Sequence, residues 1–247
     1  MPATFATYTE ASLNAYKFNP KSQEVLERKK EILTSIAQHH GSSPASVLFY
    51  GFSPLMLIST AKMIAVTDIT DEIKKFLDST GVKYVYIKEA ELTEYKKQFD
   101  WVVATDEYFT FAATEQVQLD KVQTVADLAK GVIVTTLRDY KNQDFRDREF
   151  SQPLAVRNAA VRNGRDNKIF LEYHDHDYND KNAWKTTVYE MSGDVVATGP
   201  FARRSMYFKQ MAKFSIDAGA KEFYVHKNLM YKSLIKKNYE HVISISF

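Results

Sequence analysis

The sequence predicts an α/β fold built on a doubly wound, mostly parallel sheet. Up to Thr136, short apolar segments typical of strands alternate five times with helical segments. The segment Phe99–Asp106 is apolar throughout its middle, as expected for a strand that helices cover on both faces. Ligands of such sheets bind at the carboxyl ends of the strands, so the residues that follow each strand are the first candidates for a site.

Local signals define the elements of this part. A helix starts near Pro20 and Ser22, carries an apolar stripe, and ends at Gly41. Thr70 or Asp71 is expected to cap the helix over 72–79, which ends at Gly81. Residues 1–19 are expected to be irregular or a short helix. Strands are expected at 47–50, 63–67, 82–87, 99–106 and 131–136, helices at 54–60 and 114–130, and a weak helix or loop at 91–98.

The pattern changes beyond Thr136, where a polar segment rich in arginine begins. Strand-like segments at 169–173 and 184–190 are separated by an acidic loop, 174–183. A third short strand is expected at 195–198, and 200–204 leads into a helix over 205–218. Strands at 221–226 and 241–247 close the chain. The sequence shows no repeat and no low-complexity linker, so we expect one domain over 1–247 with an inserted hairpin region at about 140–200.

Composition excludes several classes of function. The formal net charge of +2 offers no global attraction for nucleic acid or a membrane surface. The absence of cysteine excludes disulfides, thiolate nucleophiles and cysteine-ligated metals, and it suits a reducing compartment, so we expect a cytoplasmic protein. No apolar stretch approaches the length of a membrane span, and the N-terminus has no signal core.

The first two strand ends carry the pattern of a nucleotide-binding βαβ unit. The first strand runs into Tyr50-Gly51-Phe52-Ser53, where a turn brings backbone close to a ligand. The second strand ends on Asp68, an acid that can accept hydrogen bonds from a ribose. The glycine fingerprint of nicotinamide enzymes is absent, as are the motifs of serine hydrolases, P-loop proteins and zinc proteases.

The chain order resembles that of class I S-adenosylmethionine-dependent methyltransferases. That family has a Rossmann-like sheet of seven strands with an antiparallel last strand, and the resemblance covers about 20–137 and 200–247. It implies S-adenosylmethionine as cofactor and cofactor contacts at four strand ends. The small β-hairpin insertion at about 140–200 lies outside the range of the resemblance and is expected from the strand-like segments alone. The implied cofactor residues are Tyr50, Gly51, Phe52, Ser53, Asp68, Ile69, Glu89 and Thr105. Phe52 and Pro54 depart from the family, which has small residues at these positions.

These positions also have structural interpretations. The loop at Gly51 could be a tight turn that binds nothing, and Asp68 could cap the following helix. Glu89 could lie in a solvated charged loop.

Candidate catalytic residues are Asp106, Glu107 and Tyr108, because acids in a cleft act as general bases or hold a cationic substrate. Such acids also cap helices. On the substrate side we expect Arg203, Arg204 and Tyr207, since a guanidinium group suits a carboxylate or phosphate. Surface charge is the alternative interpretation of the two arginines.

Two histidine pairs raise the question of a metal. His174 and His176 alternate with Asp175 and Asp177, but in a polar loop such residues are more often solvated surface. His39-His40 stands at a helix end, where imidazole suits the helix dipole. We therefore expect no metal site.

The resulting functional hypothesis is a methyltransferase that acts on a small molecule. A second hypothesis is a methyltransferase-like subunit without catalysis, which the bulky loop at Phe52 motivates. A third is an RNA or other nucleic-acid methyltransferase, motivated by the arginines between Arg138 and Arg165, although interleaved aspartates cancel most of their field. The missing Asn-Pro-Pro-Tyr tetrad argues against methylation of DNA amino groups. No membrane partner is expected, and the sequence leaves the oligomeric state open.

Overall fold

A seven-stranded sheet in the order β10-β11-β5-β4-β1-β2-β3 forms the centre of the protein. The computed structural model describes residues 3–18, 22–138, 155–159, 169–177, 179–180, 182–192, 194–232 and 239–247. Strand β11 runs antiparallel to both neighbours, and the other paired strands are parallel. The predicted fold class is therefore confirmed. The strands are β1 Ser46–Tyr50, β2 Met63–Thr67, β3 Val85–Tyr86, β4 Phe99–Ala104, β5 Ala129–Leu137, β10 Glu222–Lys232 and β11 Tyr239–Ser246.

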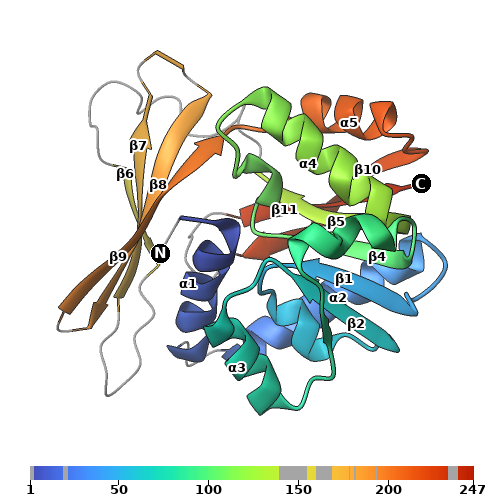
Figure 1. The fold of residues 1–247 in the computed structure, drawn as a ribbon, viewed down its shortest axis with the longest axis horizontal. Helices are drawn as coiled ribbons and strands as arrows, with labels where there is room; N and C mark the ends of the chain where they lie inside the picture. Colours follow the sequence, from blue (N-terminus) through green and yellow to red (C-terminus); the bar gives the residue numbers. More distant parts are fainter. Residues whose placement is uncertain are drawn as a thin grey trace.

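Helices cover both faces of this sheet (Figure 1). Alternate residues of β1 point to opposite faces, so Leu48 packs in the cluster under α4 and α5, and Phe49 packs in the cluster under α2. The α-helices are α1 Phe5–Phe18, α2 Ser22–His39, α3 Asp71–Thr80, α4 Glu115–Leu128 and α5 Phe208–Asp217. The described residues also form three 3₁₀ helices, η1 Pro54–Ile58, η2 Glu89–Tyr95 and η3 Tyr108–Thr110. None of the described helices is both long and apolar enough to cross a membrane.

The predicted caps of α3 are confirmed. The Thr70 hydroxyl accepts a hydrogen bond from the Ile73 N–H at 3.3 Å, and Gly81 ends the helix with φ 75°. The third strand is shorter than predicted and covers only Val85–Tyr86. Of the two alternatives expected for residues 1–19, the structure has the helix, α1, which supplies side chains to both core clusters.

A second, four-stranded antiparallel sheet stands beside α1 (Figure 1). Its strands are β6 Ala155–Ala159, β7 Ile169–His176, β8 Ala183–Ser192 and β9 Asp194–Arg204, in that order across the sheet. The predicted loop 174–183 is wrong at its start, because β7 pairs with β8 through His176. The segment 200–204 is strand rather than a lead into a helix, since Pro200 is tolerated in the edge strand β9.

Several residues of the sequence analysis lie outside the described ranges. They are Pro20 and most of the arginine-rich segment, including Arg165.

Candidate functional site

The turns that leave β2 and β4 have strained backbone. Asp68 has a φ of 53°, Asp106 of 55° and Glu107 of 57°, all in the left-handed region. Such conformations cost roughly 1–3 kcal/mol each and persist where the surrounding structure imposes them, often at functional sites. Three of the four non-glycine residues with positive φ in the described part of the chain therefore lie at the carboxyl edge of the main sheet.

Tyrosine and carboxylate groups meet at this edge. The rings of Tyr50 and Tyr108 lie 4.7 Å apart. Burial, and next the negative charge of Glu89, raise the pKa of Asp68 to about 6. Burial raises the pKa of Tyr50, and the charges of Glu89 and Asp68 add to that increase. The structure therefore brings together Tyr50, Asp68 and Glu89, three of the residues expected to hold a cofactor.

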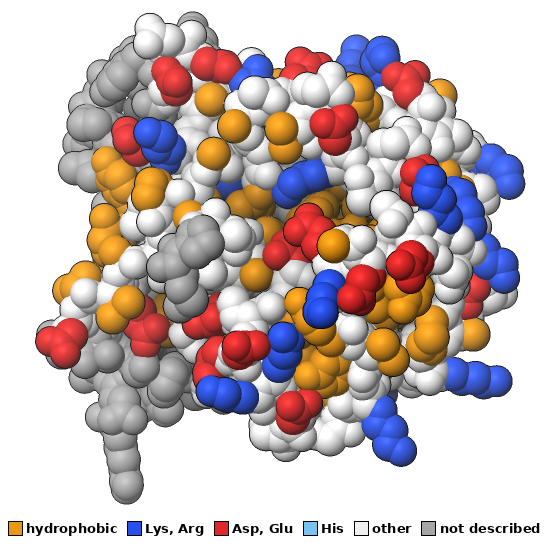
Figure 2. Space-filling model, in the orientation of Figure 1, with side chains coloured by type: hydrophobic (Ala, Val, Ile, Leu, Met, Phe, Trp, Pro, Cys, Tyr) orange, Lys and Arg blue, Asp and Glu red, His pale blue; other side chains and the backbone are white. Residues whose placement is uncertain are grey.

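Lys121 of α4 joins this group. Its Nζ lies 4.0 Å from the centre of the Tyr108 ring and donates to the Tyr108 carbonyl oxygen at 3.4 Å. Burial lowers the pKa of Lys121 to about 8, although the charge of Asp68 acts in the opposite direction. The sequence carries no signal for Lys121, because its role depends on how α4 packs. Figure 2 shows the molecule in the orientation of Figure 1, with a hollow near the middle of the visible face. Hydrophobic side chains lie inside this hollow and charged side chains lie at its rim.

The hydroxyl of Tyr50 is buried and has no hydrogen-bond partner among the described residues. Buried polar groups in folded proteins are almost always hydrogen-bonded, so an orphaned hydroxyl needs an explanation. Asp68 and Glu89 act electrostatically on the same hydroxyl. A polar ligand at this edge would satisfy it.

Helix α1 packs directly on the turn after β1. A Cβ atom at Gly51 would lie 2.7 Å from the Thr9 Cγ2 and 2.8 Å from the Phe5 Cε1, and Gly51 has a φ of 66°. The Asp68 carboxylate accepts a hydrogen bond from the backbone N–H of Ala6. Glycine is therefore required at position 51 by its backbone conformation and by the approach of α1.

Of the other expected cofactor residues, Phe52, Ile69 and Ser53 have side chains that pack elsewhere. Phe52 packs against Tyr16 and Phe76, with ring centres 6.1 and 5.7 Å away, in the cluster on the α2 face. Ile69 is buried in the same cluster. Ser53 caps η1, since its hydroxyl accepts a hydrogen bond from the Leu55 N–H at 3.4 Å. Thr105 is buried next to the strained Asp106. The bulky Phe52 thus points away from Tyr50.

A buried charge cluster adjoins the turn after β4. Glu107 Oε2 accepts hydrogen bonds from Arg138 at 3.2 Å and from Arg203 at 3.1 Å, and all three side chains are at most 2% exposed. Arg203 also donates to the Thr110 hydroxyl at 2.6 and 2.9 Å, and its guanidinium lies 3.8 Å from the Phe111 ring centre. This cluster joins β9 of the second sheet to β4 and β5 of the first.

Helix α1 and the second sheet share a further polar network. The Tyr8 hydroxyl donates to Glu172 Oε1 at 2.8 Å, and the other Glu172 oxygen lies 3.7 Å from His174 Nε2. His174 Nδ1 lies 2.9 Å from the Thr186 hydroxyl. The expectation that His174 is solvated surface is wrong. Glu172 and His174 share the inward face of β7, while Asp175 is exposed.

The three expected substrate residues do not converge. Arg203 faces the buried cluster, whereas Arg204, next in the strand, points away and pairs with Asp180. The Tyr207 hydroxyl donates to Asn182 Oδ1 at 3.0 Å on that same outer side. Arg203 alone of these three therefore reaches the site.

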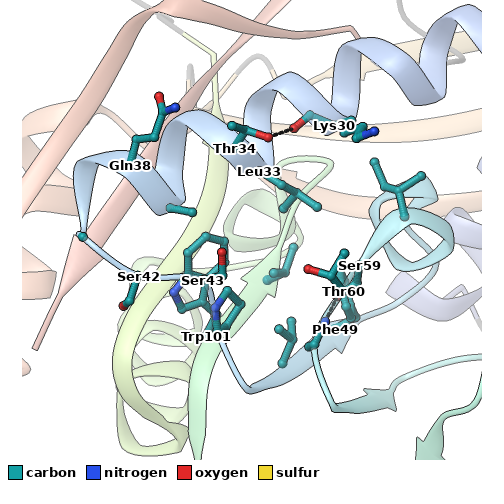
Figure 3. Close-up of a pocket in the computed structure, with 17 residues that line it drawn as sticks. Lys30, Leu33, Thr34, Gln38, Ser42, Ser43, Phe49, Ser59, Thr60 and Trp101 are labelled. Atoms are coloured by element: carbon teal, nitrogen blue, oxygen red, sulfur yellow. Dashed lines mark hydrogen bonds between the residues drawn. The ribbon is translucent and has the colours of Figure 1, made fainter.

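A separate pocket of about 590 Å³ lies between α2 and η1 (Figure 3). Its floor includes Phe49 and Trp101 on the sheet face opposite Tyr50, and Lys30 is the one charged residue among those that line it. The pocket exists because the short η1 stands between β1 and β2 where a full helix would cover the sheet. It contributes no acid or base to the site at Tyr50.

The strand order and the position of the site define the fold of class I S-adenosylmethionine-dependent methyltransferases. The chain is similar to CalS10, an amino pentose methyltransferase from Micromonospora echinaspora, with TM-score 0.66, 11% identity, and 100% and 98% of the two chains covered. DesVI from Streptomyces venezuelae is similar with TM-score 0.63 and 10% identity, and the match covers 91% of this chain and 92% of DesVI. The methyltransferase CcbJ from Streptomyces caelestis is similar with TM-score 0.60 and 13% identity, and the match covers 88% of each chain. No protein-family model matches the sequence, and no curated protein matches it.

Proposed function

We propose that this protein is an S-adenosylmethionine-dependent methyltransferase that acts on a small molecule. The observation that carries the proposal is the buried Tyr50 hydroxyl, which has no partner among the described residues and lies in the field of Asp68 and Glu89. These groups stand at the carboxyl edge, where ligands of such sheets bind.

The residues at this edge fit the proposed cofactor. The Asp68 carboxylate would accept hydrogen bonds from two ribose hydroxyls, and Glu89 would accept one from an adenine amino group. The hydroxyl of Tyr50 would hold the amino-acid part. When bound, the cofactor supplies an electrophilic methyl group.

The chain itself would position the substrate and exclude water. Methyl transfer is an in-line displacement, for which holding the reactants at the right distance and angle provides most of the acceleration. Glu107 is engaged by Arg138 and Arg203, so we assign it the positioning of these guanidinium groups. Tyr108 packs against Tyr50. We assign the buried Asp106, in the strained turn after β4, as the proton acceptor.

The enclosure of the site supports a small substrate. Tyr8 of α1 and Glu172 of β7 close its side with a buried hydrogen bond, and Arg203 comes from β9. Two similar structures are an amino pentose methyltransferase and the sugar N-methyltransferase KedS8 from Streptoalloteichus. We propose a polar small molecule as substrate and the second sheet as its cover, within one domain.

Tyr50→Phe tests the proposal with two readouts. Removing an unsatisfied buried hydroxyl leaves the stability of the free protein unchanged or raises it. The same change should weaken S-adenosylhomocysteine binding about tenfold, or about 1.4 kcal/mol, in calorimetric titration. The control is Tyr84→Phe, which removes a solvent-exposed hydrogen bond to Asp78. Equal affinity of Tyr50→Phe and the wild type would contradict the proposed site.

A folded wild-type chain that binds neither S-adenosylmethionine nor S-adenosylhomocysteine would favour the second hypothesis, a subunit without catalysis. The packing of Phe5 and Thr9 against Gly51 is the observation that favours this second hypothesis. It places α1 where the cofactor's amino-acid part would approach the turn.

A further inference from the structure

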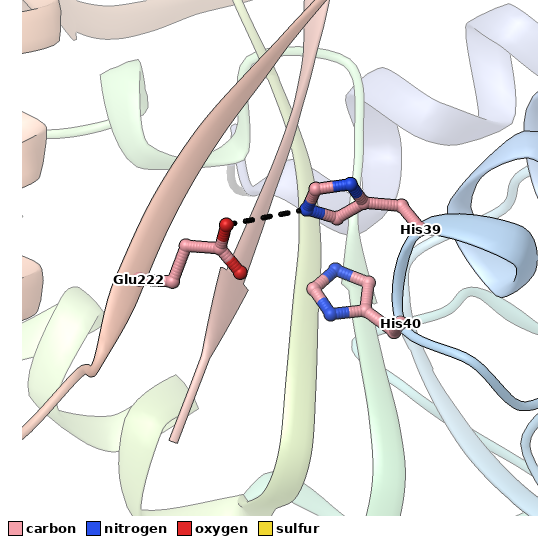
Figure 4. A group of neighbouring side chains, drawn as sticks. All are labelled: His39, His40 and Glu222. Atoms are coloured by element: carbon pink, nitrogen blue, oxygen red, sulfur yellow. Dashed lines mark ion pairs between the residues drawn. The ribbon is translucent and has the colours of Figure 1, made fainter.

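Two histidines and a glutamate meet at the opposite end of the main sheet. His39 ends α2, His40 follows it, and Glu222 begins β10. One ligand atom from each residue lies within 4.8 Å of the other two. Figure 4 shows both imidazoles and the carboxylate directed toward a common space between α2 and β10. His39 Nε2 lies 3.3 Å from Glu222 Oε1.

Neighbouring aromatic rings hold the imidazoles in place. The His39 ring stacks on Tyr224 at 4.0 Å and meets the His40 ring edge-on at 4.8 Å. Glu222, Tyr224 and His226 are alternate residues of β10, so all three face the end of α2. His226 Nε2 lies 2.8 Å from the Ser244 hydroxyl of β11, which fixes this ring behind the pair.

The imidazoles carry lone pairs that are ready for a ligand. His40 Nε2 is buried and has no hydrogen-bond partner among the described residues. Buried polar atoms in folded proteins are almost always hydrogen-bonded, so this orphaned nitrogen needs an explanation. A metal ion coordinated by the nitrogen would supply one.

We propose that His39, His40 and Glu222 form a binding site for a divalent transition metal ion, with Zn²⁺ as the best match. Imidazole nitrogen and carboxylate oxygen bind Zn²⁺ at about 2.0–2.2 Å, and three protein ligands leave a position for water. The side chains of His39 and Glu222 are 26% and 46% exposed, so small rotations can bring the donors to this spacing. The metal would tie the end of α2 to the edge strand β10.

This site would be independent of methyl transfer, because it lies at the amino end of β1 and the cofactor residues lie at its carboxyl end. A metal that binds only the folded chain stabilises it in proportion to the logarithm of its free concentration.

The test is a calorimetric titration of the full, untagged chain with ZnCl₂ at pH 7.5. We expect one equivalent of Zn²⁺ to bind and the thermal midpoint to rise. His40→Asn and Glu222→Gln should each weaken binding by about tenfold or more, which equals about 1.4 kcal/mol. The matched control is His241→Asn, since His241 packs on Phe208 outside the cluster. Cobalt(II) absorption in the visible range reports the coordination independently of heat.

Three results would overturn the proposal. The first is no Zn²⁺ binding by the folded wild-type chain. The second is unchanged affinity in both variants, which would place the ion elsewhere on the chain. The third is equal loss of affinity in His241→Asn. Metal-free thermal midpoints of the variants establish that each is folded, and none of these readouts depends on S-adenosylmethionine.

Discussion

The carboxylate of Asp68 accepts a hydrogen bond from the backbone N–H of Ala6. Ala6 lies in the first turn of α1, where N–H groups have no partner within the helix. The acid that we assign to the ribose therefore also fixes the start of the helix that packs on Gly51. If Asp68 holds the ribose as proposed, ligand binding and the position of α1 would be coupled through this one side chain.

The pKa of Asp68 predicts a specific dependence of stability on pH. Its folded-state pKa of about 6 exceeds the ordinary value of 3.8, so the folded protein binds more protons than the unfolded chain between these values. The contribution of Asp68 to stability is full below about pH 4 and is lost as the pH rises through about 6. We expect the stability of the wild type minus that of Asp68→Asn to fall across this window in urea titrations. A flat difference would contradict the assigned pKa.

The same group predicts how ligand affinity changes with pH. An ionised Asp68 accepts two hydroxyl hydrogen bonds, so S-adenosylhomocysteine affinity should rise from pH 5 to pH 7 and then level off. The Asp68→Asn variant should lack this rise. Calorimetric titrations at a series of pH values measure it, and an identical rise in the variant would assign the titration to another group.

Gly51→Ala should destabilise the protein more than Gly81→Ala. Both glycines have positive φ, 66° and 75°, and an alanine there costs about 1 kcal/mol. Only at Gly51 does the added Cβ meet another group, the Thr9 side chain at 2.7 Å, while nothing lies within 4 Å at Gly81. We expect an extra loss of about 1–3 kcal/mol from this overlap. Equal denaturation midpoints would mean that α1 does not pack on the turn as described.

Glu107→Gln should be strongly destabilising. It leaves the buried guanidinium groups of Arg138 and Arg203 without their shared carboxylate, a change that costs about 3–5 kcal/mol. Asp71→Asn removes a solvent-exposed ion pair with Lys74 and should cost less than about 1 kcal/mol. Chemical denaturation compares the two variants, and a similar small loss in both would show that the buried cluster is not held by Glu107.

The sequence was sufficient to predict the main sheet because its strands carry local signals. The apolar segments before Gly51, Asp68 and Asp106 form parallel strands, and their ends place Tyr50 and Asp68 in one site. Contacts between distant segments carry no such signal. Glu107 and Arg203 are 96 residues apart, and their pairing depends on how the second sheet lies against the first.

The side-chain direction of single residues also depended on register. His174 is buried because β7 continues to pair with β8 beyond the predicted strand end, which turns His174 inward beside Glu172. Arg203 and Arg204 point to opposite sides because β9 extends to Arg204. Residue type could not show which of Arg203 and Arg204 faces the interior, since the two are adjacent arginines.

The most direct test of the proposed function is a calorimetric titration of the purified chain with S-adenosylmethionine and S-adenosylhomocysteine. Asp68→Ala is the test variant and Asp71→Ala, whose side chain is 87% exposed, is the control. We predict binding at about micromolar dissociation constant by the wild type and the control, near −8 kcal/mol, and at least about tenfold weaker binding by Asp68→Ala. No binding by a folded wild-type chain, or equal binding by Asp68→Ala, would contradict the central claim.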